Sequence, residues 1–339
     1  MKIIVDAMGG DNAPSEIVKG AIEALSLNSK LELIFVGDET QISTIMSKLS
    51  FDKNKVTIKN ATQVIENDDS PIRSLRSKPD ASLVIGFNMI KEKTGDVLIS
   101  AGNTGAIVAG ATLLLGKIEG VDRPALTTII PTKNSFSLLL DAGANTNCRP
   151  ENYFDFGIMG YHYMKQVCGL VDPKVYLLNV GTEEKKGNEI VKAAYLMLEE
   201  APINFMGNIE GRSLPDGIAD VIVTDGFTGN VAIKVLEGTA LFMANMVKEI
   251  INTSFITKLS GLIMKDDLKV MKSKLDYAEY GGAPLLGVKG KVIKCHGSSN
   301  AKAIRNAIIK FGCNYAESSI IEDLEEEFGR LEKFTPASD

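Results

Sequence analysis

The sequence "DVLISAGNTGA", residues 96–106, decides the fold class of this chain. A short apolar run, Val97–Ile99, ends in the polar turn Ser100–Gly105, and a longer apolar run, Ile107–Leu115, follows. A short apolar run bounded by glycine and asparagine is typical of a buried strand, and the longer run has the length of a helix. The stretch therefore predicts a strand, a turn and a helix, which together form the repeating unit of an α/β fold.

Apolar runs of strand length recur along the chain, and segments with helical character lie between them. Most runs end in glycine, aspartate or asparagine, and they cover residues 3–5, 31–36, 56–58, 97–99, 137–140, 175–178, 203–206, 221–223 and 292–293. Short buried strands that alternate with helices predict a doubly wound, largely parallel sheet in a three-layer αβα body. The length of 339 residues allows about two domains or one large unit, and we predict a single α/β domain, residues 1–339.

Residues 252–275 differ from this pattern. They hold five lysines against two aspartates. Their apolar side chains follow helical spacing, and these are Phe255, Ile256, Leu259, Leu262 and Ile263. We predict an amphipathic helical segment that protrudes from the α/β body, although such a stripe also suits packing in the core or in a dimer interface.

The composition disfavours several classes of function. A net charge of −6 and an aromatic content of 6% without tryptophan disfavour nucleic-acid binding, which needs a basic face or aromatic stacking. Four scattered cysteines without a CxxC pair and two histidines form neither a disulfide framework nor a zinc pattern, so we expect no metal and no cofactor. The first residues do not resemble a signal peptide, and no apolar run approaches the ~20 residues of a spanning helix. We therefore expect a soluble, cytoplasmic protein.

Five polar glycine turns follow predicted strands. They are "DAMGGD" (6–11), "SAGNTGA" (100–106), "DAGAN" (141–145), "GTEEKKGN" (181–188) and "TDGFTGN" (224–230). In open α/β sheets such turns lie at helix N-termini, where free N–H groups bind anions or polarise a carbonyl. The same residues are also the ordinary chemistry of turns and helix caps. Five of them in one chain favour a site for phosphate or for an activated carbonyl, and since no Walker or G-x-G-x-x-G motif occurs, ATP and dinucleotides are disfavoured.

Single side chains near these turns have two interpretations each. His296, in "KCHGSS" (294–299), is either part of a binding site or a hydrogen-bonded structural histidine. Its neighbour Cys295 would point to the opposite face of a strand, so the two do not form a good catalytic dyad. Lys185 lies in a turn where an anion would bind, although a charge cluster of this kind is usually solvated.

Eight motifs together resemble the bacterial phosphate acyltransferase (PlsX) family. They occur in order from residue 2 to about residue 310, and they are "VDAMGGDNAP", "SAGNTGA", "GVDRPAL", "LLLDAGAN", "LLNVGTEEKKGNE", "DVIVTDGFTGNVAIK", "LDYAEYGGAPLLGVKG" and "IKCHGSSNAKAI". Because many separate motifs agree over nearly the whole chain, the resemblance is specific.

The resemblance implies a reaction, a fold and a set of partners. The family converts acyl-acyl-carrier-protein and inorganic phosphate into acyl phosphate and free carrier protein, which feeds phospholipid synthesis. The implied fold is that of isopropylmalate dehydrogenase and phosphotransacetylase. The resemblance further implies a homodimer that associates peripherally with the membrane and passes its product to a glycerol-3-phosphate acyltransferase.

The resemblance and the turn geometry assign roles to individual residues. We predict that Lys185 neutralises the phosphate or the oxyanion and that Asn230 donates a hydrogen bond to the carbonyl oxygen, and both roles rest partly on the resemblance. Turn geometry predicts a phosphate cradle, which consists of Asn103, Thr104, Gly105, Thr228 and Gly229. We expect His296 and Ser298 to line the pocket. In this family the apolar residues of 252–275 look like a membrane-contacting tip, although the lysines of this segment could equally receive the acidic carrier protein.

Three other functions compete with this interpretation. A phosphotransacetylase-like enzyme would use short acyl-coenzyme A in place of the carrier protein. A decarboxylating dehydrogenase on a related fold would need an aspartate cluster for a metal and a site for a nicotinamide cofactor. A non-catalytic membrane scaffold would bind carrier protein without turnover.

Overall fold

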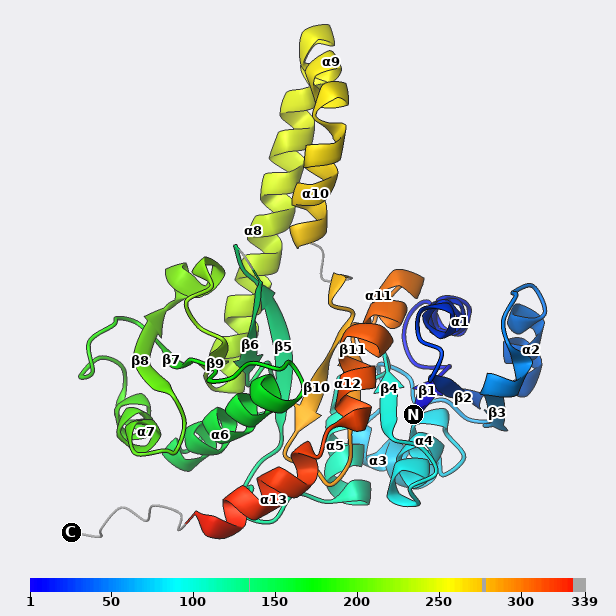
Figure 1. Cartoon of the computed structure of the whole chain (residues 1–339), viewed down its shortest axis with the longest axis horizontal. Coiled ribbons are helices and arrows are strands. Elements are labelled where there is room, and N and C mark those ends of the chain that lie inside the picture. The colour runs from blue at the N-terminus through cyan, green and yellow to red at the C-terminus, as the bar shows by residue number, and fades with distance from the viewer. Residues whose placement is uncertain (134, 276–278, 332–339) are drawn as a thin grey trace.

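The structure is a computed structural model, and it describes residues 1–133, 135–275 and 279–331. Within them an 11-stranded sheet has the order β3-β2-β1-β4-β11-β10-β5-β6-β9-β7-β8 (Figure 1). The strands are β1 (Lys2–Asp6), β2 (Glu32–Gly37), β3 (Val56–Asn60), β4 (Val97–Ser100), β5 (Ala125–Pro131), β6 (Phe136–Leu140), β7 (Val175–Asn179), β8 (Phe205–Glu210), β9 (Val221–Val223), β10 (Gly282–Leu286) and β11 (Val292–Cys295). Every predicted apolar run overlaps one of these strands, whereas β5 and β10 lie outside the runs.

Helices cover both faces of the sheet. They are α1 (Ser15–Leu27), α2 (Glu39–Met46), α3 (Pro71–Ser77), α4 (Ser82–Lys91), α5 (Thr104–Gly110), α6 (Pro150–Gln166), α7 (Glu189–Glu199), α8 (Gly226–Asn252), α9 (Phe255–Ile263), α10 (Lys265–Leu275), α11 (Ala301–Asn306), α12 (Cys313–Glu317) and α13 (Ile320–Arg330). Successive residues of a strand point to opposite faces. Ile3 and Val5 of β1 accordingly lie in the same core cluster as the buried residues of α1, whereas Ile4 lies in the cluster that includes those of α4. The predicted α/β class, with a largely parallel sheet between two helical layers, is confirmed.

The two halves of the sheet run in opposite directions. Neighbouring strands pair in parallel from β3 to β11 and again from β6 to β8. The three pairings in the middle, which are β11–β10, β10–β5 and β5–β6, are antiparallel. An odd number of antiparallel pairings reverses the direction, so the carboxyl ends of β4 and β6 point to opposite edges of the sheet.

The carboxyl ends of β4 and β6 nevertheless lie at nearly the same position along the strand direction. The registers connect them through the pairs Leu98–Val292, Val292–Leu285, Leu285–Leu126 and Thr127–Leu140. Leu140 is the last residue of β6, and Leu98 lies two residues before the end of β4. The turns that follow the two strands can therefore approach each other over the middle of the sheet.

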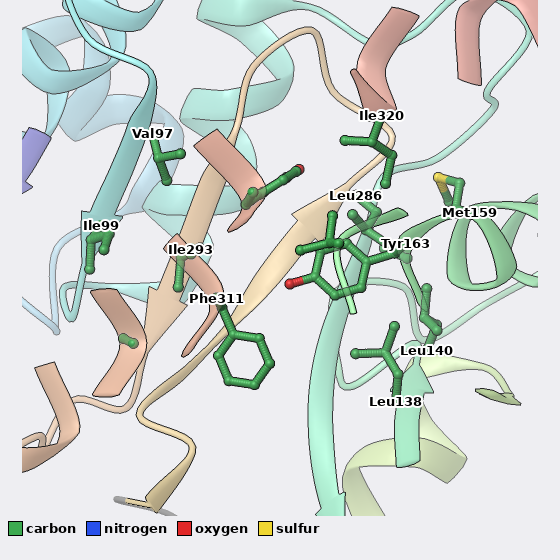
Figure 2. Packing of buried hydrophobic residues seen from close by; sticks show 14 of the residues in the cluster. Val97, Ile99, Leu138, Leu140, Met159, Tyr163, Leu286, Ile293, Phe311 and Ile320 are labelled. Carbon is green, nitrogen blue, oxygen red and sulfur yellow. The ribbon is translucent and has the colours of Figure 1, made fainter. Parts of the chain in front are cut away.

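One buried cluster extends across this middle. Figure 2 shows Val97, Ile99 and Ile293 from one half beside Leu138 and Leu140 from the other, with aromatic side chains between them. All five aliphatic side chains are at most 1% exposed. Burial of this apolar surface stabilises the two halves against each other, which fixes the position of the turns above it.

A helical arm extends from this body (Figure 1). It consists of the carboxyl-terminal part of α8 together with α9 and α10, so it begins before the predicted protrusion at 252–275. Ser254 caps α9, since its Oγ accepts from the Thr257 N–H at 3.2 Å, and α9 folds back on α8. A Cβ placed on Gly261 would lie 2.5 Å from Cγ2 of Ile251, so a larger residue there would require Ile251 to shift. Among the described residues, no helix combines the length and the hydropathy that crossing a membrane requires.

Candidate active site

A cavity of about 390 Å³ lies where the middle strands meet the first turns of α8. Four of its polar lining residues come from three separate segments: Thr104 follows β4, Asn230 and Lys234 lie on α8, and His296 follows β11. The apolar lining comes mostly from β5, α8 and the start of β10, and it includes Leu126, Ile129, Ile233, Tyr280 and Ala283. The cavity therefore has both polar and apolar walls.

Asn230 is positioned by the cap of α8. Asp225 Oδ1 accepts from the Thr228 N–H at 2.8 Å, and its Oδ2 accepts from the Thr228 hydroxyl at 2.8 Å and the Tyr153 hydroxyl at 3.1 Å. Gly229 lies against the carbonyl oxygen of Asp141, because a Cβ placed there would be 2.0 Å from that oxygen. Thr228 and Gly229 thus fix the helix start, and Asn230 is the residue of this turn that lines the cavity.

The turn after β6 is organised around the buried carboxylate of Asp141. It accepts backbone hydrogen bonds from Leu126 at 3.1 Å, Gly143 at 3.2 Å and Asn145 at 2.6 Å. Burial raises the pKa of Asp141, and these hydrogen bonds oppose the rise. The result is a rigid turn that brings Gly143 to the cavity beside Asn230.

The turn after β4 places Thr104 at the cavity. Asn103 caps α5, since its Oδ1 accepts from the Ala106 N–H at 2.9 Å, and its Nδ2 donates to the Asn67 carbonyl at 2.9 Å. Gly105 lies against Pro71, whose Cγ would be 2.7 Å from an added Cβ. The side chain of Asn103 thus holds a neighbouring loop, and Thr104 is the residue of this turn that lines the cavity.

The first glycine turn, residues 6–11, supports two of the other turns. The buried carboxylate of Asp6 accepts from the hydroxyls of Ser82 and Ser100, both at 2.6 Å. The Asp11 N–H donates to the Gly297 carbonyl at 2.8 Å. This turn therefore fixes the loops that follow β4 and β11.

His296 lines the cavity, and its hydrogen bonds define the tautomer of its ring. Its Nδ1 lies 3.2 Å from the Ser298 N–H, which donates to it, and 2.8 Å from the Ser298 hydroxyl. Because Nδ1 accepts, the neutral ring carries its proton on Nε2. Burial lowers the pKa of His296, and the positive charges of Lys294 and Lys234 lower it further. His296 is therefore a neutral hydrogen-bond donor near pH 7, and Ser298 orients it.

Sequence reasoning missed two lysines that line the cavity, Lys234 and Lys294. The signal for Lys294 was present, because it lies between Ile293 and Cys295, both fully buried, and the alternation of a strand places it on the opposite face. Lys234 lies one helical turn after Asn230, so both project from one side of α8.

Lys185 lies elsewhere. It is exposed in the turn after β7 and is not among the residues that line the cavity. The turn is held by Asn179 Nδ2, which donates to the Lys186 carbonyl at 3.0 Å, and by Asn208 Nδ2, which donates to the Glu183 carbonyl at 2.9 Å. The catalytic role of Lys185 stays a prediction.

The predicted tip residues all lie on α9 and are exposed. Phe255 and Ile263 are 83% and 80% exposed, and Ile256, Leu259 and Leu262 are also solvent-accessible over more than half of their surface. No residue of α9 is buried. Such a surface has no partner within the described part of the chain.

The cavity is suited to acyl transfer onto an anion. Two lysines and a neutral histidine favour negative charge, Asn230 can donate to a carbonyl oxygen, and the apolar wall can hold an acyl chain. The neighbouring thiol of Cys295 is a poor nucleophile, because full burial raises its pKa to about 12.

Comparison with known proteins first defines the class of fold. A phosphotransacetylase from Streptococcus pyogenes superposes with a TM-score of 0.64 over 94% of each chain at 16% sequence identity, which establishes a common fold. A branched-chain phosphotransacylase from Enterococcus faecalis has a TM-score of 0.57 over 94% of this chain and 100% of its own, at 12% identity.

Sequence comparison then defines the family. The profile described as "Fatty acid synthesis protein" matches residues 1–318. The phosphate acyltransferase of Acetivibrio thermocellus is 48% identical over 98% of each chain, and that of Clostridioides difficile is 46% identical over 96% of this chain and 95% of its own. The chain belongs to the fatty acid synthesis protein family, together with proteins named phosphate acyltransferase, and it is an acyltransferase.

Proposed function

We propose that this enzyme transfers the acyl group of acyl-acyl-carrier-protein to inorganic phosphate, which yields acyl phosphate and free carrier protein for phospholipid synthesis. The observation that supports this most directly is the cavity in which Asn230, His296 and two lysines face an apolar wall. Relatives that are almost half identical over the full length are named phosphate acyltransferase, which is consistent with this acceptor.

The reaction requires positioning and charge stabilisation. A phosphate oxygen attacks the thioester carbonyl carbon, the carbonyl oxygen becomes an oxyanion, and the C–S bond then breaks to release the carrier thiolate, which takes up a proton. Asn230 donates to the oxyanion, and His296 donates to the phosphate through Nε2–H. Thr104 and the turn backbones complete the phosphate site, with Asn103, Gly105, Thr228 and Gly229 holding those turns in place. Because thioester and acyl phosphate are both activated acyl groups, the transfer requires no ATP.

We assign Lys185 to neutralisation of the phosphate or the oxyanion. Because this turn is exposed, Lys185 can reach a cavity in two ways. Either the turn moves toward the cavity of its own chain, or Lys185 enters the cavity of a second copy of the chain. Mixing the inactive variants Lys185→Ala and Asn230→Ala separates them, because only contribution from a second copy restores activity in the mixture. Full activity of Lys185→Ala alone would remove Lys185 from the mechanism.

The first test is release of free carrier-protein thiol from palmitoyl-acyl-carrier-protein, with and without inorganic phosphate, with hydroxylamine present to trap acyl phosphate. Phosphate-dependent release and a trapped hydroxamate are expected. Release that is indifferent to phosphate, or activity confined to short acyl-coenzyme A, would overturn the assignment.

The arm supports a peripheral role at the membrane. The exposed apolar residues of α9 lie beside Lys258 and Lys265, a combination that suits an anionic lipid surface. We propose that this tip binds the cytoplasmic face of the membrane, where the lipophilic product passes to a glycerol-3-phosphate acyltransferase. Sedimentation with anionic liposomes tests this, and failure to sediment would contradict it.

Pairing of two copies would cover a second apolar surface. Exposed apolar side chains recur on one side of α8 at spacings of four and seven, and they include Phe227, Val231, Val235, Phe242, Met246 and Ile250. Spacing of this kind forms a seam between helices. We propose a homodimer that pairs through this stripe, and Val235→Lys should shift the mass in solution from dimer to monomer.

A further inference from the structure

Lys294 is a half-buried cation that forms no salt bridge within the part of the chain that the structure describes. It lies on β11 between two fully buried apolar residues, and its side chain lines the cavity. Burial lowers its pKa, and no carboxylate of the described residues forms a salt bridge with its Nζ. Nearby Lys291 is also partly buried, but its Nζ donates to the carbonyls of Ala316 at 3.0 Å and Ser318 at 2.5 Å. Fixed internal acceptors therefore satisfy Lys291, whereas Lys294 faces open space.

A second lysine approaches the same space from another element. Lys234 of α8 lines the cavity and pairs with Glu237 at 2.7 Å. Its charge lowers the pKa of Lys294 and of His296, so the two ammonium groups repel each other across the cavity. Among the described carboxylates, Glu237 pairs with Lys234, whereas Asp11 acts on Lys294 and His296 without a salt bridge to Lys294. Such an arrangement does not favour folding, but it is favourable once an anion occupies the space.

We propose that Lys294 and Lys234 form a clamp that binds the inorganic phosphate nucleophile, with the Nε2–H of His296 as a neutral third donor. This inference rests on the proposed function, and it names residues that recognise one of the substrates. A compact dianion fits ammonium groups that act as point charges. Asn230 and Lys234 lie one turn apart on the same side of α8, which places bound phosphate next to the carbonyl that Asn230 would polarise.

Substitution of the clamp lysines should change the KM for phosphate rather than the KM for the acyl donor. Lys294→Met and Lys234→Met should each raise the KM for phosphate about tenfold or more, because each removes a charge-assisted hydrogen bond. The KM for acyl-acyl-carrier-protein should change less than about twofold in the same variants, since neither lysine is proposed to contact the carrier. Lys289→Met is the matched control, because Lys289 is exposed in the β10–β11 turn and pairs with Glu325 at 3.6 Å.

Glu237→Gln provides a test of opposite sign. Its carboxylate competes with phosphate for Lys234 and repels the dianion. The substitution should therefore lower the KM for phosphate about threefold. A rise in this variant would contradict the clamp.

Binding can also be measured without turnover. The chain has two histidines, so the imidazole NMR signals of His296 and His162 can be followed separately as inorganic phosphate is added. Phosphate should move the His296 signal and raise its pKa, while His162 in α6 serves as the reference. Among the described residues, the charged groups that act on His296 include Lys294, Lys234, Glu237 and Asp11. Removal of either lysine should therefore raise the pKa of His296 in the absence of phosphate and weaken phosphate binding about tenfold.

The readouts separate the clamp from the proposed reaction. Phosphate binding to His296 in an enzyme without phosphate-dependent thiol release would overturn the reaction and support the clamp. Phosphate-dependent release with an unchanged phosphate KM and an unchanged dissociation constant in both variants would overturn the clamp alone. If Lys294→Met fails to fold, the more exposed Lys234→Met decides the question by the same two constants.

Discussion

The first turns and the later turns of α8 obey different constraints. In the first turn Gly226 and Gly229 are the only buried residues of the helix, and Asp225 and Asp141 fix the backbone by hydrogen bonds and close contact. In the later turns several large apolar side chains are exposed, including Leu241, Phe242 and Ile250. One helix therefore holds Asn230 at the cavity by contacts within the chain and also presents an exposed apolar surface. Substitutions in the first part should change chemistry and stability, and those in the second part should change association.

The largest expected effect is on catalysis at Asn230. Asn230→Ala removes the donor that we propose for the developing oxyanion, and it should lower kcat by about 10²–10³-fold, or roughly 3–4 kcal/mol in the barrier. Asn245→Ala is the matched control, since Asn245 is exposed on the arm part of the same helix. Steady-state kinetics of thiol release measure both variants. Equal losses in the two would show that the helix acts as one unit and would remove the contrast.

Alanine substitutions of two glycines on this helix should change the free energy of unfolding in opposite directions. Gly229→Ala places a Cβ against the Asp141 carbonyl and should lower the free energy of unfolding by about 1–3 kcal/mol through overpacking. No described atom lies within 4 Å of a Cβ added to Gly238. Gly238→Ala should therefore stabilise the helix by up to about 1 kcal/mol. Urea denaturation measures both, and destabilisation by Gly238→Ala would contradict the exposed setting of the arm.

The strands that sequence reasoning missed are those that reverse the sheet. β10, "GAPLL", contains Gly282 and Pro284, which weaken the signal of a strand. β5, "ALTTIIP", has the β-branched residues of a strand, so its existence could have been predicted. Its antiparallel pairing with β6 is local, but its pairing with β10 joins residues more than 150 positions apart and could not be predicted. Local pattern thus predicted the α/β class, while the opposed halves required the tertiary structure.

For the site, too, local sequence pattern predicted single residues but not all of their neighbours. Sequence reasoning predicted Thr104, Asn230 and His296 as site residues, and these three line one cavity together with Gly143 of another predicted turn. The structure gives other neighbours to Asn103 and Thr228, whose polar groups bind adjacent backbone or the helix cap. Lys234 was not predicted, because a lysine on an amphipathic helix is ordinarily solvated, and a cavity beside it cannot be read from spacing.

The arm should affect membrane binding without affecting chemistry. Replacing Leu259 and Ile263 by serine removes two exposed apolar side chains, each of which could contribute about 1.5–3 kcal/mol when buried in lipid. The double variant should bind anionic vesicles at least about tenfold more weakly and keep its kcat on soluble substrate. Leu196→Ser is the control, since Leu196 is 55% exposed on α7 of the body. Equal loss with the control would locate binding outside the arm.

The smallest expected effect compares two helix caps. Ser254 caps α9 in the arm, and Asp38 caps α2 in the body, where its Oδ1 accepts from the Gln41 N–H at 2.9 Å. Replacement of either by alanine should remove about 1 kcal/mol from its helix. In the body this loss should lower the denaturation midpoint, because α2 unfolds with the core. In the arm it should instead speed amide exchange of α9 about fivefold and leave the midpoint unchanged, because local opening is independent of global unfolding. A lower midpoint in Ser254→Ala would mean that arm and body unfold together, and the contrast along α8 would then be one of exposure rather than of cooperativity.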